Sequence, residues 1–254
     1  MSLVLRDSAL ASLPDELRAL LRRYAKQLGV IFAEDLAALV LYGSAAGPDY
    51  LPDRSNVNVL VVLARHQPEA LRRYAGQHHV WKKEQVAPLF LSREEIQSTR
   101  ARFPLEYQDM ADTHLVLAGD DPFTEPAVDS VVLTDACRRE FRGQVVRLRQ
   151  RFVEGGGTVE AVLLLLPLSL TALLPALRGW VRAQGRPVRR GADAVIHDVQ
   201  SLAGLDLAAL IDVLQLKRGQ IGPGPAEAPR LFVRYLAALE ALAGAADKDV
   251  KRDA

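Results

Sequence analysis

Residues 43–63, GSAAGPDYLPDRSNVNVLVVL, decide the fold of this chain. The run before them, residues 36–42, is rich in Leu and Val, which predicts a buried strand. The strand is expected to end at Gly43-Ser44, where a glycine lets the backbone turn sharply and approach a phosphate closely. Backbone N–H groups in such a turn, together with the Ser44 hydroxyl, are suited to hold a triphosphate.

A second strand is expected over residues 56–63, after a polar loop. Because side chains two apart on a strand point to the same side, Asn56 and Asn58 are expected to face the turn. Val57 and Val59 then face the core. Two amides therefore stand where a two-metal phosphoryl-transfer site would aim a pair of carboxylates.

This pattern resembles the motif of the nucleotidyltransferase superfamily, whose fold is shared by polymerase-β-like enzymes and antibiotic nucleotidyltransferases. Gly43, Ser44 and Ser55 match the motif, whereas Asn56 and Asn58 replace its Asp-x-Asp or Asp-x-Glu. The resemblance implies an α+β fold, with a nucleotidyltransferase-like mixed sheet flanked by helices. It also implies that Gly43, Ser44 and Ser55 bind ATP or another nucleoside triphosphate, and that Asn56 and Asn58 lie at the metal positions.

The third carboxylate of the family is expected at Glu106, which is the catalytic candidate and the third metal-ligand candidate. Residues 103–110, FPLEYQDM, have a proline near the start and alternate after it, which predicts a strand. If the strand register slips by one, Asp109 takes the place of Glu106. A solvated acid with no metal role is the alternative, since exposed carboxylates are far commoner than metal ligands.

Two amides in place of two carboxylates lower the expected affinity for metal. Mg²⁺ prefers charged oxygen ligands, and two neighbouring metal ions repel each other unless carboxylates neutralise them. We therefore expect Mg²⁺ to bind weakly and only with nucleotide, and nucleotidyl transfer to a hydroxyl to be impaired.

The alternative function is a non-catalytic nucleotide-sensing or protein-interaction module. The spacing of Arg190 and His197 resembles that of HEPN ribonucleases, whose partner antitoxins are often minimal nucleotidyltransferases. A toxin–antitoxin role is therefore included in this alternative.

The pattern changes from strands to helices in the second half of the chain. A stripe at helical spacing, Phe141, Val145, Leu148 and Phe152, opens a run of helices. We expect a nucleotidyltransferase-like domain over residues 1–126 and a C-terminal helical bundle over residues 127–254. Arginines beside this stripe are expected to line a cleft between the two halves and to bind nucleotide phosphates: Arg138, Arg142 and Arg149.

Other elements of the first half follow from local signals. A helix is expected to start at Ser12 as its N-cap, and two more over residues 68–77 and 92–98. Two further strands are expected over residues 88–91 and 114–118.

Composition narrows the class of protein. The net charge of +1 argues neither for nor against a nucleic acid partner, which stays possible but not favoured. The single cysteine, Cys137, excludes an internal disulfide and a four-cysteine zinc site. A cytoplasmic location is expected. Residues 161–177 are uncharged but contain Pro167 and Pro175, so a buried helix is expected there and no membrane span. The sequence specifies neither an acceptor nor a partner protein.

Overall fold

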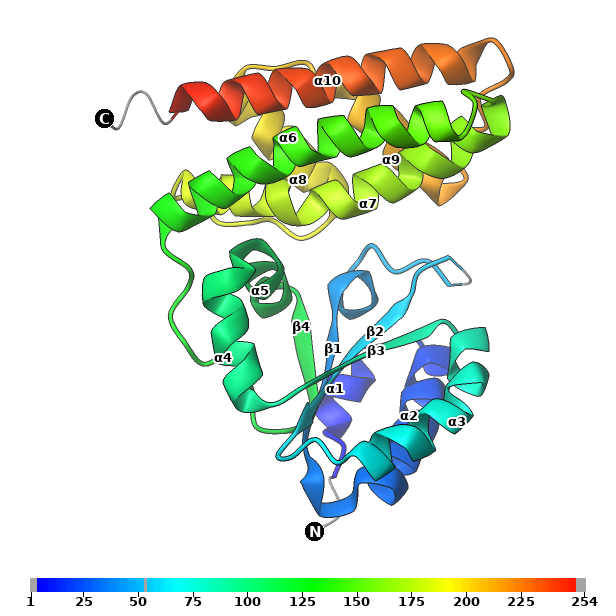
Figure 1. Ribbon diagram of the computed structural model, residues 1–254, viewed down its shortest axis with the longest axis vertical. Helices are drawn as coiled ribbons and strands as arrows, with labels where there is room; N and C mark the ends of the chain where they lie inside the picture. Colours follow the sequence, from blue (N-terminus) through cyan, green and yellow to red (C-terminus); the bar gives the residue numbers. More distant parts are fainter. Residues whose placement is uncertain (1–3, 53, 250–254) are drawn as a thin grey trace. The chain divides into compact units, whose positions relative to one another are not determined.

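The chain divides into two compact units in a computed structural model that describes residues 4–52 and 54–249 (Figure 1). Unit 1 consists of Met1–Phe103 and Tyr107–Ala127, and unit 2 of Pro104–Glu106 and Val128–Ala254. Unit 1 holds a mixed sheet with helices, and unit 2 is helical. The α+β class, with a sheet flanked by helices and a following helical bundle, is therefore confirmed.

The sheet has four strands in the order β3-β2-β1-β4. Its strands are β1 (Leu36–Tyr42), β2 (Val57–Leu63), β3 (Val86–Leu91) and β4 (His114–Gly119). Strand β1 runs antiparallel to both β2 and β4, whereas β2 and β3 are parallel. The parallel pair needs a crossover connection, which α3 supplies. Four of the five expected strands are present, and β3 begins two residues earlier than the sequence indicated.

The helices of unit 1 are α1 (Asp7–Ala11), α2 (Asp15–Phe32), α3 (Pro68–Lys83) and α4 (Arg93–Arg102), with short 3-10 turns η1 (Ala33–Asp35) and η2 (Gly43–Ala46). Helix α5 (Pro104–Asp112) is divided, because its first residues, Pro104–Glu106, group with unit 2. Helices α2 and α3 lie on one side of the sheet and α4 on the other (Figure 1). Ser92 caps α4 as expected, because its side chain accepts from the Glu95 N–H while Glu95 accepts from the Ser92 N–H. The expectation that Ser12 caps α2 is wrong. Ser12 lies at the end of α1, and its hydroxyl donates to the Ala9 carbonyl.

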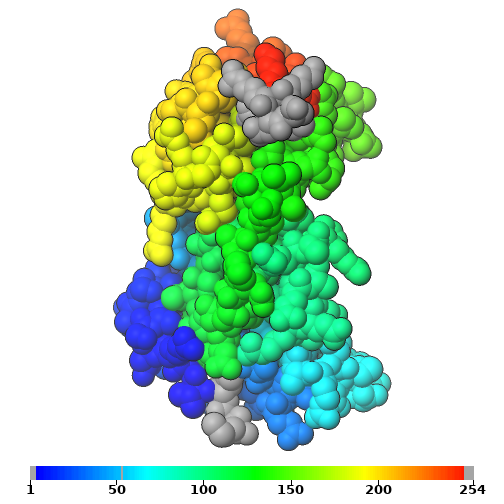
Figure 2. All heavy atoms as spheres, turned by 90° about the vertical axis from the view of Figure 1, so that its left-hand side faces the viewer, coloured from blue at the N-terminus to red at the C-terminus, as the bar shows by residue number. Residues whose placement is uncertain are grey.

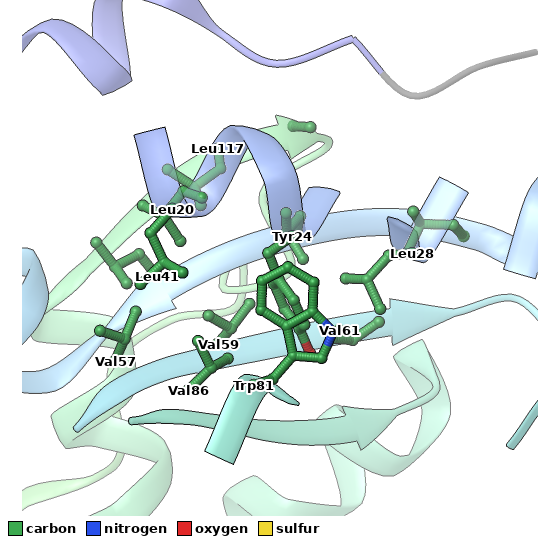
Figure 3. Close-up of a cluster of buried hydrophobic side chains, with 14 of the residues drawn as sticks. Leu20, Tyr24, Leu28, Leu41, Val57, Val59, Val61, Trp81, Val86 and Leu117 are labelled. Atoms are coloured by element: carbon green, nitrogen blue, oxygen red, sulfur yellow. The ribbon is translucent and has the colours of Figure 1, made fainter. Parts of the chain in front are cut away.

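The core of unit 1 lies between the sheet and helices α2 and α3. Val59 and Val61 of β2 are fully buried there, beneath Tyr24 and Trp81 (Figure 3). The rings of Tyr24 and Trp81 meet edge to face with centroids 4.9 Å apart. The Tyr24 hydroxyl shares a 2.9 Å hydrogen bond with that of Tyr74, and burial raises the pKa of Tyr24. The hydroxyls of Tyr24 and Tyr74 therefore satisfy each other in the core.

The expectation of a strand over residues 103–110 is wrong. Phe103 is the N-cap of helix α5, and the residues after it belong to the helix. Pro104 is the first residue of the helix, where its missing N–H costs nothing. Leu105, Tyr107 and Gln108 are buried while Glu106 is exposed, which is a helical rather than an alternating pattern. A short segment with apolar residues two apart fits the period of a strand and that of a helix. Tertiary packing therefore determines that this segment is helical.

Unit 2 contains α6 (Ser130–Glu154), α7 (Val159–Ala183), α8 (Ala192–Ala203), α9 (Ala208–Arg218) and α10 (Glu227–Asp249). Helix α7 packs against each of the other four. Its Trp180 ring contacts Phe141 of α6 edge to face, and its Ser169 hydroxyl accepts from Tyr235 of α10. Among the described helices, α7 alone is long and apolar enough to cross a membrane by length and composition. Leu166, Leu170 and Leu173 are fully buried in the bundle, whereas Leu164 and Leu168 are exposed, so the expected helix is present and is buried on one face.

Asp35 links the start of β1 to the end of β2. Its carboxylate accepts from Arg65 Nε at 2.8 Å and from Gln67 Nε2 at 2.7 Å, and its carbonyl accepts from the Ala64 N–H. The hydrogen bond from Arg65, followed by that from Gln67, lowers the pKa of Asp35.

We expect Asp35→Asn to lower the free energy of unfolding at pH 7, because Arg65 loses its carboxylate partner. Since the pKa of Asp35 is depressed in the folded state, this advantage of the wild type is complete above the ordinary pKa of 3.8. It is lost as the pH falls through the lower folded-state value. Urea unfolding of both proteins at pH 7 and at acidic pH measures the difference. A difference that stays constant with pH would show that shape, not charge, carries the contact.

Gly119 closes the β1–β4 pairing in a conformation that only glycine adopts easily. Its φ is +73°, and a Cβ there would lie 2.2 Å from the Ala37 carbonyl oxygen. We expect Gly119→Ala to destabilise unit 1 by about 2 kcal/mol or more. Gly47→Ala is the matched control, since a Cβ at Gly47 meets nothing within 4 Å, and should change stability by less than about 0.5 kcal/mol. Urea unfolding followed by tryptophan fluorescence compares them, and equal effects would contradict the assigned strain.

Candidate functional site

The Gly-Ser turn lies at the end of β1, as the sequence predicts. Gly43 has a φ of +72° and opens the 3-10 turn η2. Its N–H donates to the Thr113 carbonyl at 3.1 Å, so this N–H holds the turn to the start of β4. The Ser44 carbonyl accepts from the Gly47 N–H at 3.0 Å and closes the turn. The hydroxyl and N–H of Ser44 are thus the groups of the turn suited to an anion, since the first N–H groups of a helical turn have no carbonyl partner within it.

Asn58 lies directly beside this turn. A Cβ placed on Gly43 would be 3.1 Å from Asn58 Nδ2, so the amide and the turn are in near contact. Asn58 pairs with Tyr42 of β1, the residue before Gly43, while Val57 and Val59 are buried in the core. The expected alternation is therefore observed. Asn56 is exposed and lies one residue before β2 begins.

The strands on either side of Asn58 carry no carboxylate at its level. Asn58 pairs with Ala87 of β3 on one side and Tyr42 on the other, and Tyr42 pairs with His114 of β4. Side chains that are paired across strands point to the same face of the sheet. The row across this end of the sheet is therefore Ala87, Asn58, Tyr42 and His114.

The His114 side chain contacts two residues outside this row, Ala111 and Asp121. Its Nδ1 lies 2.8 Å from the Ala111 carbonyl oxygen, and its Nε2 lies 3.3 Å from Asp121 Oδ2. The second Asp121 oxygen accepts from the Phe123 N–H at 2.8 Å. Asp121 is therefore engaged in fixing the loop after β4.

The strand position assigned to Glu106 is wrong. Glu106 is exposed on α5 and belongs to the segment that groups with unit 2. The alternative, Asp109, is half-buried on the same helix and not on a strand either. The position that the sequence analysis missed is Ala87. Strand β3 was expected, but its register against β2, which sets Ala87 beside Asn58, carries no local sequence signal.

Ser55 is buried and holds the loop that precedes β2. Its hydroxyl accepts from the Leu51 N–H at 3.0 Å, and its own N–H donates to the Leu51 carbonyl at 2.9 Å. These two bonds tie Ser55 to Leu51. A contact between Ser55 and nucleotide stays a prediction.

The three arginines assigned to nucleotide phosphates form ion pairs within unit 2. Arg138 pairs with Asp135 at 2.6 Å, Arg142 with Asp247, and Arg149 with Glu240. The last two pairs join α6 to α10, which gives these arginines a structural contact. Their assignment to nucleotide stays a prediction.

Arg190 and His197 both lie at the surface of unit 2. Arg190 precedes α8, and His197 is on the exposed side of that helix. His197 is close enough to Asp193 to contribute to its lowered pKa, whose main cause is the hydrogen bond from Arg218. The described structure thus pairs Asp193 with Arg218, at 3.1 Å, and gives no further support to a ribonuclease-like pair.

Comparison with known proteins supports the fold. One solved structure, a spectinomycin adenyltransferase, AAD(9), from Enterococcus faecialis with ATP and spectinomycin, is similar with a TM-score of 0.53 at 10% sequence identity. The likeness covers 87% of this chain and 98% of that chain. The fold is therefore nucleotidyltransferase-like. No protein-family model and no curated protein matches the sequence.

The side chains at the site do not fit a pair of Mg²⁺ ions. Across the described residues, 4–52 and 54–249, there is no group of three His, Cys, Asp or Glu that could hold a metal ion. The row at Asn58 offers one neutral amide oxygen, Asn56 adds a second only from the residue before β2, and Ala87 has no ligand atom. Two divalent cations need anionic oxygens to neutralise their repulsion.

We expect the wild type to bind no Mn²⁺ at millimolar concentration. In variants that regain carboxylates, the affinity for Mn²⁺ should depend on the residue at position 87. Asn56→Asp with Asn58→Asp should bind Mn²⁺ weakly. Adding Ala87→Glu should raise the affinity at least tenfold, since a third carboxylate then stands beside the second. Ala87→Gln in the same background has the same length without the charge and serves as the control. Calorimetric titration with Mn²⁺ compares these variants, and equal affinities for the Glu and Gln variants would refute the placement.

Proposed function

We propose that this protein binds a nucleoside triphosphate at the Gly43-Ser44 turn without a metal-ion pair and does not efficiently transfer the nucleotidyl group. The observation that supports this proposal most directly is that the Asn58 amide lies against Gly43, with Ala87 beside it on the adjoining strand. The nucleotidyltransferase-like fold supports a nucleotide as ligand, since AAD(9) was solved with ATP.

The charge of the site favours binding of the free triphosphate. A carboxylate about 4 Å from a phosphate oxygen repels it by roughly 1 kcal/mol in water and about 4 kcal/mol at an effective dielectric of 20. Metal ions normally cancel this repulsion. Amides at positions 56 and 58 remove it, and the Nδ2 groups can donate hydrogen bonds to phosphate oxygens. Mg²⁺ is then unnecessary for binding.

Asn56 and Asn58 also remove the anionic ligands for the metal ions that would stabilise the transition state of nucleotidyl transfer. Nucleotidyl transfer depends on positioning and on neutralising the charge that develops on the phosphate oxygens, which metal ions supply in two-metal sites. The turn and two amides position the triphosphate but bring no cation to it. A binding protein, rather than an efficient transferase, fits this donor set best.

We expect ATP to bind with the same affinity, within about threefold, in excess Mg²⁺ and in EDTA, because Asn56 and Asn58 replace the two carboxylates whose charge a metal would screen. Calorimetric titration under both conditions measures this, and a pyrophosphate assay run alongside should show no product. A strict requirement for Mg²⁺, or steady pyrophosphate release, would overturn the proposal. No nucleotide binding under either condition would favour the protein-interaction module instead.

We expect Gly43→Val to lower ATP affinity at least tenfold, about 1.4 kcal/mol. Valine is strained at a φ of +72°, and its Cβ would press on the Asn58 amide. Gly47→Val is the control from the same turn, since Gly47 is extended and a Cβ there meets nothing within 4 Å. Circular dichroism establishes that both variants are folded before titration. Unchanged affinity in folded Gly43→Val would place the phosphate site elsewhere.

A further inference from the structure

Tyr42 is a polar side chain directly beside the Gly-Ser turn. It is the last residue of β1, and it pairs with Asn58 of β2. Paired side chains share a face of the sheet, so Tyr42 and Asn58 lie on the face opposite to the core residues Val57 and Val59. Helix α4 lies on this side of the sheet (Figure 1) and forms part of the surface of unit 1 (Figure 2).

The Tyr42 hydroxyl has no hydrogen-bond partner in the part of the chain that the structure describes. Its neighbour in the row, His114, has both ring nitrogens at hydrogen-bond distance from other residues. Tyrosine hydroxyls usually have a partner when buried, as that of Tyr24 has on the other side of the sheet. The open hydroxyl of Tyr42 is therefore a distinct feature of this face.

A ligand in solution can reach this hydroxyl. Among the described residues, the polar side-chain atoms that are enclosed without a partner belong to Arg18, Trp81 and Arg100. The side chains of Tyr42, Ser44 and Asn58 are half-buried and have no described partner, yet their polar atoms are outside this enclosed set, so solvent reaches each of them. Three uncharged polar groups with hydrogen-bonding capacity are thus gathered at one end of the sheet.

The Tyr42 side chain is a hydrogen-bond donor at neutral pH. Burial raises the pKa of Tyr42 above its ordinary value of 10.0, so the phenol keeps its proton. Deprotonated phosphate oxygens only accept hydrogen bonds, and a bond to such an anion is roughly twice as strong as one between neutral groups. A phosphate oxygen is therefore an acceptor well matched to this hydroxyl.

We propose that Tyr42 is a further ligand-binding residue, whose hydroxyl donates a hydrogen bond to a phosphate oxygen of the triphosphate held at the Gly43-Ser44 turn. Its position beside Gly43 and its open hydroxyl support this assignment. The inference rests on the proposed nucleotide binding and adds a contact to the same site. Because the donor is uncharged and needs no cation, it contributes to binding in the absence of Mg²⁺.

Tyr42→Phe removes the hydroxyl alone and tests the assignment. In calorimetric titrations with EDTA present, its affinities for ATP and for inorganic tripolyphosphate should both fall about fivefold or more, since a hydrogen bond to a charged group is lost. Its free energy of unfolding in urea should not fall, because the hydroxyl has no described partner to lose. Tyr24→Phe is the matched control with the opposite result: it breaks the bond to Tyr74, so stability should fall while ATP affinity stays the same within about twofold.

Each contrary result identifies what is wrong. Unchanged affinity for both ligands in Tyr42→Phe would overturn this inference and leave nucleotide binding at the turn intact. A loss for ATP alone, or a wild type that does not bind tripolyphosphate, would contradict the phosphate contact. A loss of stability equal to that of Tyr24→Phe would assign the hydroxyl a structural role. A wild type that does not bind ATP would overturn the proposed function, and this inference with it.

Discussion

The antiparallel pairing of β1 with β2 is the constraint on which the rest of unit 1 depends. It sets Tyr42 opposite Asn58 and so brings the turn that follows β1 against the amide of β2. The pairing is held by aliphatic side chains that alternate toward α2 and α3, since a slip of one residue would turn this whole buried set to the other face. The hydrogen bonds from Arg65 and Gln67 to Asp35 fix the opposite end of the same two strands.

Because this pairing fixes the backbone of the site, its chemistry depends on the side chains at three positions, 56, 58 and 87. The backbone and the turn are those of a nucleotidyltransferase-like fold, while the side chains at positions 56, 58 and 87 bring two amides and a methyl group. The charge of these three side chains, not the shape of the backbone, is what distinguishes them from the carboxylates of a two-metal motif. On the function that we propose, a neutral site accepts a phosphate anion without prior screening by metal ions.

The arginines of unit 2 form ion pairs that the sequence did not indicate, while their assignment to nucleotide phosphates stays a prediction. Arginines that flank an apolar helix stripe are equally suited to cover core edges, to pair with acids on a neighbouring helix or to bind phosphates. In the structure, Arg142 and Arg149 pair with carboxylates of α10 across the α6–α10 contact.

The sequence by itself determined the turn at Gly43, the alternation through Asn58, the cap at Ser92 and the buried character of α7, because each depends on local conformation or on a sustained period. Only the tertiary structure decided that residues 104–112 are helical and that Glu106 is no strand ligand, since a short apolar pattern fits both periods. It alone identified Ala87 as the neighbour of Asn58. Strand register between distant segments follows from the packing of a whole sheet, and no single segment encodes it.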